Sequence, residues 1–231
     1  MKVMGIVNVT PDSFSDGGKF FTSEEAVRRA RNLVDDGADI IDLGGESTRP
    51  GATPIGWEEE WRRIEPVIEK LSDMTISVDT YHPETARLAI AAGAKIVNCV
   101  YAEFIPEMLK LLASNSVELV VPVKALEMVP ECRSMLSRLY IDPMIGFGTT
   151  REEDLRLLKS ISELSQQGRV LVGASRKRIV KKLTGGKVTG KNIGGNLAIA
   201  MWSAIKGASV VRVHDVLETV QALRVFAALE D

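Results

Sequence analysis

Residues 2–18 read KVMGIVNVTPDSFSDGG, and this stretch decides between the two folds that the rest of the chain allows. Its first half is an apolar run rich in Val and Ile, as in a buried strand, and a polar turn follows from Asn8 onward. An open doubly wound sheet carries a glycine-rich nucleotide-binding fingerprint in its first strand-to-helix turn. The turn NVTPDSFSDGG lacks that fingerprint, which favours a closed barrel.

The strand-then-helix pattern repeats along the whole chain. Its strand candidates are apolar on both faces, which is typical of a parallel sheet that is covered on both sides. We predict strands at residues 2–9, 39–43, 75–79, 95–100, 117–123, 139–142, 170–173 and 209–213. We predict helices at residues 23–36, 57–71, 83–92, 105–113, 126–137, 151–166, 192–206 and 216–229. Eight alternating units without a linker predict one α/β domain over residues 1–231, a (β/α)8 TIM barrel.

Composition excludes several classes of protein. The chain has 231 residues, of which 45% are hydrophobic, and a net charge of −2, so neither disorder nor nucleic-acid binding is expected. Its apolar runs are too short to span a membrane. Residues 1–9 lack the charged leader of a signal peptide, and two cysteines, Cys99 and Cys132, fit a reducing compartment. We therefore expect a cytoplasmic protein, with both cysteines as small core residues.

Polar side chains gather where a barrel keeps its functional groups, at the C-terminal ends of the strands and in the loops that follow. Seven of the eight predicted strand ends carry such polar groups, and the fifth has only Lys124 after its apolar run. In chain order the polar residues are Asn8, Thr10, Asp12, Asp42, Glu46, Ser47, Thr48, Arg49, Asp79, Asn98, Lys124, Asp142, Ser175, Arg176, Lys177, Arg212, His214 and Asp215.

The basic members of this set predict an anion site. Arg49, Lys177, Arg212 and His214 can together bind a phosphate or a diphosphate. Mg²⁺ prefers few protein ligands plus phosphate oxygens, so Asn8 with a bound diphosphate can hold this ion. No His or Cys spacing matches a zinc site, and no nucleophile elbow is present.

The acidic and amide members predict a second function on the same face. Asp79, Asn98 and Asp142 can hydrogen-bond a flat, donor-rich heterocycle and stabilise positive charge that develops on it. Asp79 lies among apolar strand residues, where a charge must be paired or functional. Asp42 is interpreted as a buried hydrogen-bonding residue that holds the second loop, and His82 as a helix-start or a surface residue.

The chain is similar to the dihydropteroate synthase family in motifs spread from residue 4 to residue 219. These motifs are MGIVNVTPDSFSDGG, GADIIDLGGESTRPG, SVDTY, IVN, DPMIGFG, VLVGASRK and VVRVHDVLET. The resemblance implies a (β/α)8 barrel, usually a homodimer, in folate biosynthesis. It implies a transferase that joins 7,8-dihydropterin-6-ylmethyl diphosphate to p-aminobenzoate or a related arylamine, and releases diphosphate by a dissociative mechanism.

The resemblance also implies roles for individual residues. The pterin ring would be held by Asp79, Asn98, Asp142 and Lys177, and diphosphate with Mg²⁺ by Asn8, Arg212 and His214. The arylamine pocket would be formed by Thr48, Arg49, Pro50, Phe147 and Ser175. The catalytic set would be Asp79, Asp142, Lys177 and Arg49, with Asn8 as the metal ligand.

The chain departs from the family pattern around strands four to six. Cys99, Met144 and Thr149 stand where the family has Asp, Gly and Lys, and the fifth strand runs almost directly into a helix. An N-terminal hairpin that is common in the family is missing as well. A pterin-binding methyltransferase barrel and a catalytically silent pterin-binding paralogue are therefore the alternatives.

Overall fold

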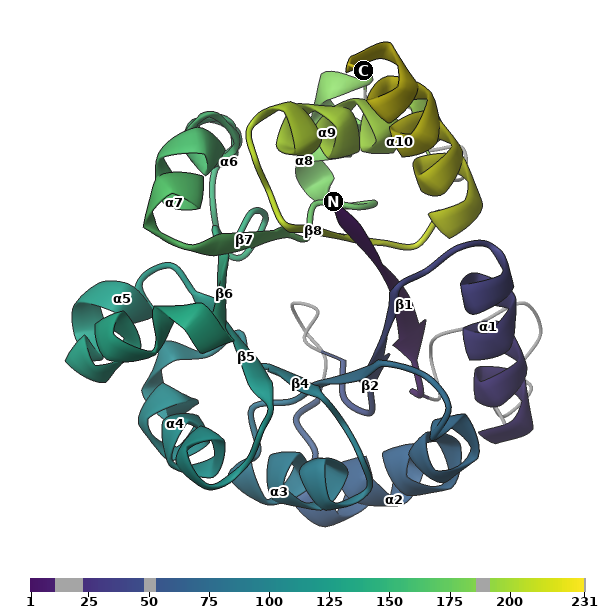
Figure 1. Ribbon diagram of the computed structural model, residues 1–231, viewed down its shortest axis with the longest axis vertical. Helices are drawn as coiled ribbons and strands as arrows, with labels where there is room; N and C mark the ends of the chain where they lie inside the picture. Colours follow the sequence, from purple (N-terminus) through teal and green to yellow (C-terminus); the bar gives the residue numbers. More distant parts are fainter. Residues whose placement is uncertain (11–22, 48–52, 186–191, 231) are drawn as a thin grey trace.

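The computed structural model describes residues 1–10, 23–47, 53–185 and 192–230, and it contains a closed barrel of eight parallel strands in sequence order. Helices surround the barrel on its outside (Figure 1). The strands are β1 (Lys2–Asn8), β2 (Ile40–Gly44), β3 (Ile76–Asp79), β4 (Ile96–Asn98), β5 (Glu118–Pro122), β6 (Leu139–Asp142), β7 (Arg169–Val172) and β8 (Val210–Val213). The predicted (β/α)8 barrel is confirmed, and each strand lies within about two residues of its predicted bounds.

The first strand closes the barrel because it pairs on both of its edges. Met4 is opposite Ile40 of β2, and Lys2 is opposite Val210 of β8. The backbone groups of the eight strands thus find partners around the ring, so the sheet has no open edge.

The outer helices are α1 (Ser23–Asp35), α2 (Trp57–Ile68), α3 (Pro83–Ala91), α4 (Ile105–Ser114), α5 (Ala125–Met128), α6 (Arg151–Lys159), α7 (Ile161–Gln167), α8 (Arg178–Leu183), α9 (Ile193–Ile205) and α10 (Val216–Glu230). Local sequence explains several of their starts. Pro83 takes a first-turn position in α3, and Thr150 and Glu153 form a reciprocal capping box at α6. In the described residues, no helix has the length and apolar character that a membrane span requires.

Two predicted helices differ from the structure, and one observed helix was not predicted. The helix predicted at 126–137 is wrong: α5 ends at Met128, and a 3-10 helix covers Pro130–Arg138. Val129 is extended, because a residue before proline is disfavoured in the α conformation. The helix predicted at 151–166 breaks at Ser160, whose hydroxyl donates to the Leu157 carbonyl. A short extra helix, α8, precedes α9.

Strand alternation divides the apolar side chains into two cores. One large core lies between the sheet and the helices. A second core has one residue from each of seven strands, which places it inside the barrel: Met4, Ile40, Ile96, Val120, Tyr140, Leu171 and Val210. Two residues further along, the inward side chains become polar on four of these strands, with Asp42, Asn98, Asp142 and Arg212. On β1 the change comes four residues after Met4, at Asn8. The barrel is therefore apolar below and polar at its C-terminal mouth.

A polar cluster closes the opposite mouth. Arg169 at the start of β7 pairs with Glu118 at the start of β5, and its guanidinium lies 4.1 Å from the centre of the Tyr140 ring. The Tyr140 hydroxyl donates to the same carboxylate at 3.1 Å. With this end filled, the C-terminal mouth is left as the position for a ligand.

Candidate active site

A buried guanidinium joins the strand ends at the C-terminal mouth. Arg212 of β8 donates from Nε to Asp42 Oδ2 at 2.5 Å and from Nη2 to Asp79 Oδ2 at 2.7 Å. Asp42 also accepts from Asn98 Nδ2 at 3.2 Å. Four strands, β2, β3, β4 and β8, are thereby tied together across the inside of the barrel.

Asp42 is a site residue that the sequence interpretation underrated. It is buried, as expected, but its partners are Arg212 and Asn98 across the barrel rather than the second loop. The signal was available, because Asp42 shares the inward alternation of Asp79 and Asp142. Asp42 comes two residues after Ile40, whose side chain lies inside the barrel, so the side chain of Asp42 also points inward, beside Asp79 and Asp142.

Two buried oxygens in this network can accept hydrogen bonds from a ligand. Asp42 Oδ1 and Asn98 Oδ1 have no hydrogen-bond partner within the described part of the chain. Buried acceptors are nearly always satisfied in native proteins, by protein groups, water or ligand. A flat molecule with several N–H donors fits this arrangement.

Lys177 lies on the other side of the mouth, beneath the turn after β6. Its amine donates to the Ile145 carbonyl at 2.6 Å and lies 4.0 Å from the centre of the Phe147 ring. Gly146 has a φ of +78°, and a Cβ there would lie 2.8 Å from Lys177 Cδ. Glycine is therefore required at this position both by its backbone conformation and by the lysine stem beside it.

The departures from the family pattern are accommodated in the same region. Met144 has a φ of 67°, and its N–H donates to Asp142 Oδ1 at 2.7 Å, so the carboxylate holds a conformation that glycine favours. Thr149 Oγ1 accepts from Gly146 N and donates to Asp154, which pins the turn. Cys99 is buried in the outer core, as predicted, and so is Cys132.

Burial shapes the ionisation of the site. It raises the pKa of Asp79 and of Asp142, with the positive charges of Arg212 and Lys177 opposing the shift. Burial also lowers the pKa of Lys177 to about 8, and here the charge of Asp142 opposes the shift. Although burial disfavours its charge, the pKa of Arg212 is raised by Asp42 and Asp79.

The residues predicted to bind an anion have different surroundings in the structure. His214 follows β8, and its Nδ1 lies 3.2 Å from Ser175 Oγ, which also accepts from the His214 backbone N–H at 3.3 Å. Asn8 ends β1, and its Oδ1 would lie 3.6 Å from a Cβ at Gly44. Arg212 is bound to two carboxylates rather than facing solvent. The predicted residues Thr48, Arg49 and Pro50 lie outside the described residues.

A further polar cluster, which the sequence did not predict, flanks the second loop. His82 Nε2 lies 3.2 Å from Glu46 Oε2 and 3.1 Å from the Ile55 carbonyl oxygen. The Tyr81 hydroxyl donates to Glu46 Oε1 at 2.8 Å. His82 stands at the start of α3, as one of the two interpretations expected, but the surface interpretation is wrong, since its side chain is 20% exposed and contacts two other segments. Only the tertiary structure brings these segments together.

Comparisons with known proteins place this site in a family context. The family model for pterin binding enzyme matches residues 4–136 and 135–214. The dihydropteroate synthase of Streptococcus pyogenes serotype M6 is 38% identical over 93% of this chain and 90% of its own length. The probable bifunctional folylpolyglutamate synthase/dihydropteroate synthase of Haloferax volcanii is 38% identical over 99% of this chain, which spans 30% of its length.

A solved structure is similar over nearly the whole chain. The Xanthomonas albilineans dihydropteroate synthase with 4-aminobenzoic acid has a TM-score of 0.90 and 42% sequence identity. The match covers 99% of this chain and 93% of that one.

The shifted pKa of Lys177 predicts a pH dependence of stability. Between about pH 8 and 10.5 the unfolded chain holds a lysine proton that the folded protein has lost, so rising pH favours the folded state. Across this window we expect the free energy of unfolding of wild type to rise relative to Lys177→Met, as measured by urea denaturation. The exposed Lys182→Met variant should follow wild type, and parallel curves for wild type and Lys177→Met would contradict the prediction.

Proposed function

Because this chain belongs to the pterin-binding enzyme family, we propose that it is a dihydropteroate synthase, which joins 7,8-dihydropterin-6-ylmethyl diphosphate to p-aminobenzoate and releases diphosphate. The observation that carries the proposal is the buried network of Arg212 with Asp42, Asp79 and Asn98 inside a closed barrel, in which Oδ1 of Asp42 and of Asn98 accept no hydrogen bond from the described residues. Relatives that match over most of the chain include the dihydropteroate synthases of Streptococcus pyogenes and Xanthomonas albilineans.

The pterin ring is assigned to the acceptors at the barrel mouth. Asp79, Asn98 and Asp142 offer oxygens to the ring N–H groups, and Lys177 donates to the ring carbonyl. Positive charge that develops on the pterin methylene is stabilised by the buried carboxylates, because few waters screen them. This use of the carboxylates requires no covalent nucleophile from the protein.

The reaction is a displacement at the methylene carbon. The C–O bond breaks first, and its electron pair leaves with diphosphate, which Arg212 and His214 bind. The arylamine nitrogen then forms the new C–N bond and loses one proton. To bind the diphosphate, the Arg212 guanidinium gives up part of its contact with Asp79. The diphosphate then replaces the carboxylate as an anionic partner of the guanidinium.

The arylamine binds beside Phe147, whose ring stands over the Lys177 amine and can pack against an aromatic substrate. Ser175, Thr48, Arg49 and Pro50 complete the proposed pocket. Since Cys99 and Cys132 are both free and buried, the enzyme fits the reducing cytoplasm where folate synthesis would take place.

Turnover tests the proposal directly. Wild type should form dihydropteroate from the pterin diphosphate and p-aminobenzoate, and Asp79→Ala and Lys177→Ala should each lower kcat/KM by about 10²-fold or more with the fold retained. The exposed Lys182→Ala variant is the matched control.

Other outcomes of this assay identify the alternatives. Full activity in either site variant, measured as diphosphate release, would remove the assignment. Pterin binding without turnover would favour a silent paralogue, and turnover that needs a methyl donor would favour a methyltransferase. Preference for a ribosylated arylamine would change the second substrate only.

Mg²⁺ is the proposed metal, and the chemistry of the donors fits it. Asn8 supplies one amide oxygen at the mouth, and the described residues contain no group of three or more His, Cys, Asp or Glu side chains arranged around a metal. Mg²⁺ commonly takes one or two protein ligands and completes its shell with phosphate oxygens and water. When bound, it would neutralise charge on the leaving diphosphate.

Removal of Mg²⁺ should therefore affect the two halves of the substrate differently. We expect chelation to weaken binding of inorganic diphosphate by at least about tenfold and binding of a pterin without phosphate hardly at all, because only the former supplies metal ligands. Calorimetry with each ligand measures this difference. Equal effects on both would contradict the role of Asn8.

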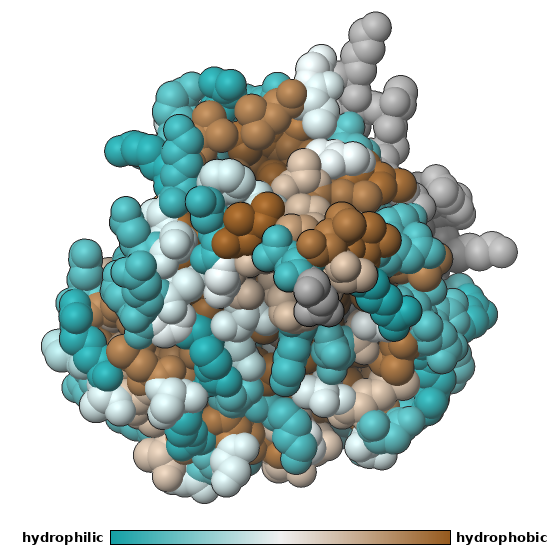
Figure 2. Space-filling model, turned by 45° about the horizontal axis from the view of Figure 1, so that its top comes forward, coloured by the Kyte–Doolittle hydropathy of each residue, from teal (hydrophilic) through white to brown (hydrophobic). Residues whose placement is uncertain are grey.

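A homodimer is proposed through the apolar surface over α9 and α10. Apolar side chains gather on this part of the molecule (Figure 2), and Ile205, Val225 and Leu229 are 57%, 62% and 80% exposed. A helix as apolar as α9 is normally covered. A second copy of the chain is the proposed cover.

Charges on this surface should separate the subunits. We expect wild type to sediment as a dimer and the double variant Ile205→Glu/Val225→Glu as a monomer, because burying unpaired carboxylates is costly. The control is Met128→Glu on α5, which is equally exposed but lies elsewhere on the barrel. A monomeric wild type, or a dimeric double variant, would contradict the interface.

A further inference from the structure

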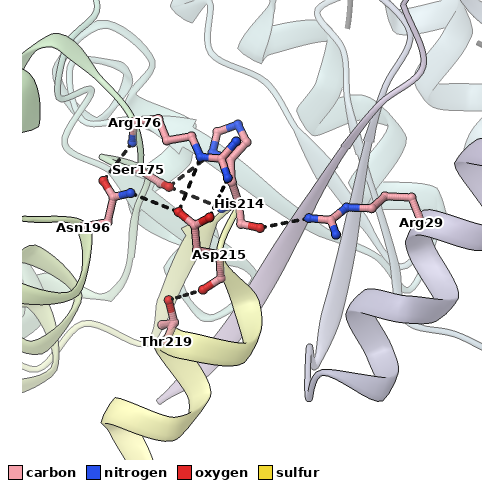
Figure 3. Close-up of polar contacts among 7 residues, drawn as sticks. All are labelled: Arg29, Ser175, Arg176, Asn196, His214, Asp215 and Thr219. Atoms are coloured by element: carbon pink, nitrogen blue, oxygen red, sulfur yellow. Dashed lines mark hydrogen bonds and ion pairs between the residues drawn. The ribbon is translucent and has the colours of Figure 1, made fainter. Parts of the chain in front are cut away.

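We propose that Asp215, Asn196 and Arg176 form a positioning unit that orients His214 toward the leaving diphosphate. This inference rests on the proposed function, because it assigns a role behind the diphosphate site. The three residues come from separate segments: Arg176 from the β7–α8 turn, Asn196 from α9 and Asp215 from the β8–α10 turn (Figure 3).

The centre of the unit is the buried carboxylate of Asp215. The Asp215 side chain is 4% exposed, and Arg176 Nη2 donates to its Oδ1 at 2.5 Å. Its Oδ2 accepts from Asn196 Nδ2 at 3.1 Å and lies 3.4 Å from Arg176 Nε. A buried charge with this set of donors is held in one place.

Asn196 joins this carboxylate to the backbone of the β7–α8 turn. Its Oδ1 accepts from the Arg176 N–H at 3.0 Å, while its Nδ2 donates to Asp215. Arg176 has a φ of 60°, in the left-handed region that glycine favours. The unit therefore holds a backbone conformation that an arginine would otherwise leave.

This conformation decides where the two neighbours of Arg176 point. Ser175 reaches His214, and Lys177 reaches the Ile145 carbonyl, while the Arg176 guanidinium turns away to Asp215. One turn thus serves both halves of the site, and the unit behind it fixes the turn.

Ser175 in turn fixes the imidazole. Its hydroxyl oxygen accepts a hydrogen bond from the His214 backbone N–H. In our proposal the hydroxyl hydrogen is donated to Nδ1 of the His214 ring. The ring proton then lies on Nε2, from which it is donated to an anion. Without the unit, Ser175 would no longer be held against His214. The imidazole would then no longer be fixed in the tautomer that carries its proton on Nε2.

The backbone around His214 is anchored independently. Arg29 of α1 donates from Nη2 to the His214 carbonyl at 3.1 Å, and Thr219 donates to the Asp215 carbonyl at 2.7 Å (Figure 3). Because these anchors hold the main chain, the unit can be altered while the strand end stays in place. Its effect is then on the Ser175 and His214 side chains.

A swap of polar groups tests the unit. N196D keeps the acceptor for the Arg176 N–H but sets a second carboxylate against Asp215, and D215N sets two amides against each other. In the double variant N196D/D215N, the amide at position 215 donates to the carboxylate at position 196, so the network is restored in reverse polarity. Asn32→Asp on the exposed face of α1 is the control, because it replaces an amide by a carboxylate as N196D does, but away from the unit.

The readouts are the Kd of inorganic diphosphate with Mg²⁺, by calorimetry, and the KM values of both substrates. We expect each single variant to weaken diphosphate binding by about tenfold or more, as for a lost hydrogen bond to a charged group, and the double variant to recover most of it. KM for p-aminobenzoate should rise in the single variants and recover in the double variant, because Ser175 also belongs to the proposed arylamine pocket. A fall in Tm with unchanged diphosphate binding would show a merely structural role and overturn the proposal.

Further arms keep the outcome decisive. If a single variant fails to fold, Ser175→Ala removes the link to His214 and leaves the unit intact, and the same loss of diphosphate affinity is expected. Wild type that binds diphosphate but makes no dihydropteroate would overturn the proposed function while the swap still tests the unit. Wild type that turns over, with single variants that bind as well as wild type, would overturn the unit alone. No diphosphate binding by wild type would overturn both.

Discussion

The contact of Arg212 with Asp42 and Asp79 is the interaction on which the rest of the site depends. Charges inside a barrel are costly unless they are paired, and one guanidinium pairs with two carboxylates from neighbouring strands. Among the described residues, the carboxylates of Asp42, Asp79 and Asp142 lie at the same mouth as the cations Arg212 and Lys177. Their oxygens suit a donor-rich heterocycle and a developing cation.

This electrostatic arrangement exists because the barrel separates its two ends. Below the network, Met4, Ile40 and Leu171 fill the interior with apolar packing, and Arg169 closes the far mouth with Glu118. A ligand can therefore approach from one side only. The described turns that carry Lys177 and His214 lie around the open mouth, and they are held by Asn196 of α9 and Arg29 of α1.

The sequence departures do not interrupt this arrangement. Met144 replaces a glycine at a left-handed position but is held there by the carboxylate that the site uses, and Thr149 pins the same turn through Asp154. Cys99 lies in the outer core, away from the polar network. Met144, Thr149 and Cys99 therefore belong to the residues that hold the site in place, and the polar groups of the site do not depend on their side chains.

The sequence by itself determined the barrel and the identity of most polar groups, because strand alternation and strand-end chemistry are local. It placed Asp79, Asn98, Asp142 and Lys177 at one mouth without any coordinates. Only the tertiary structure decided which groups meet: Arg212 with Asp42 across the barrel, or Asp215 with Asn196 at its edge. Such contacts join residues far apart in the chain, and their geometry depends on register and burial, which no local pattern encodes.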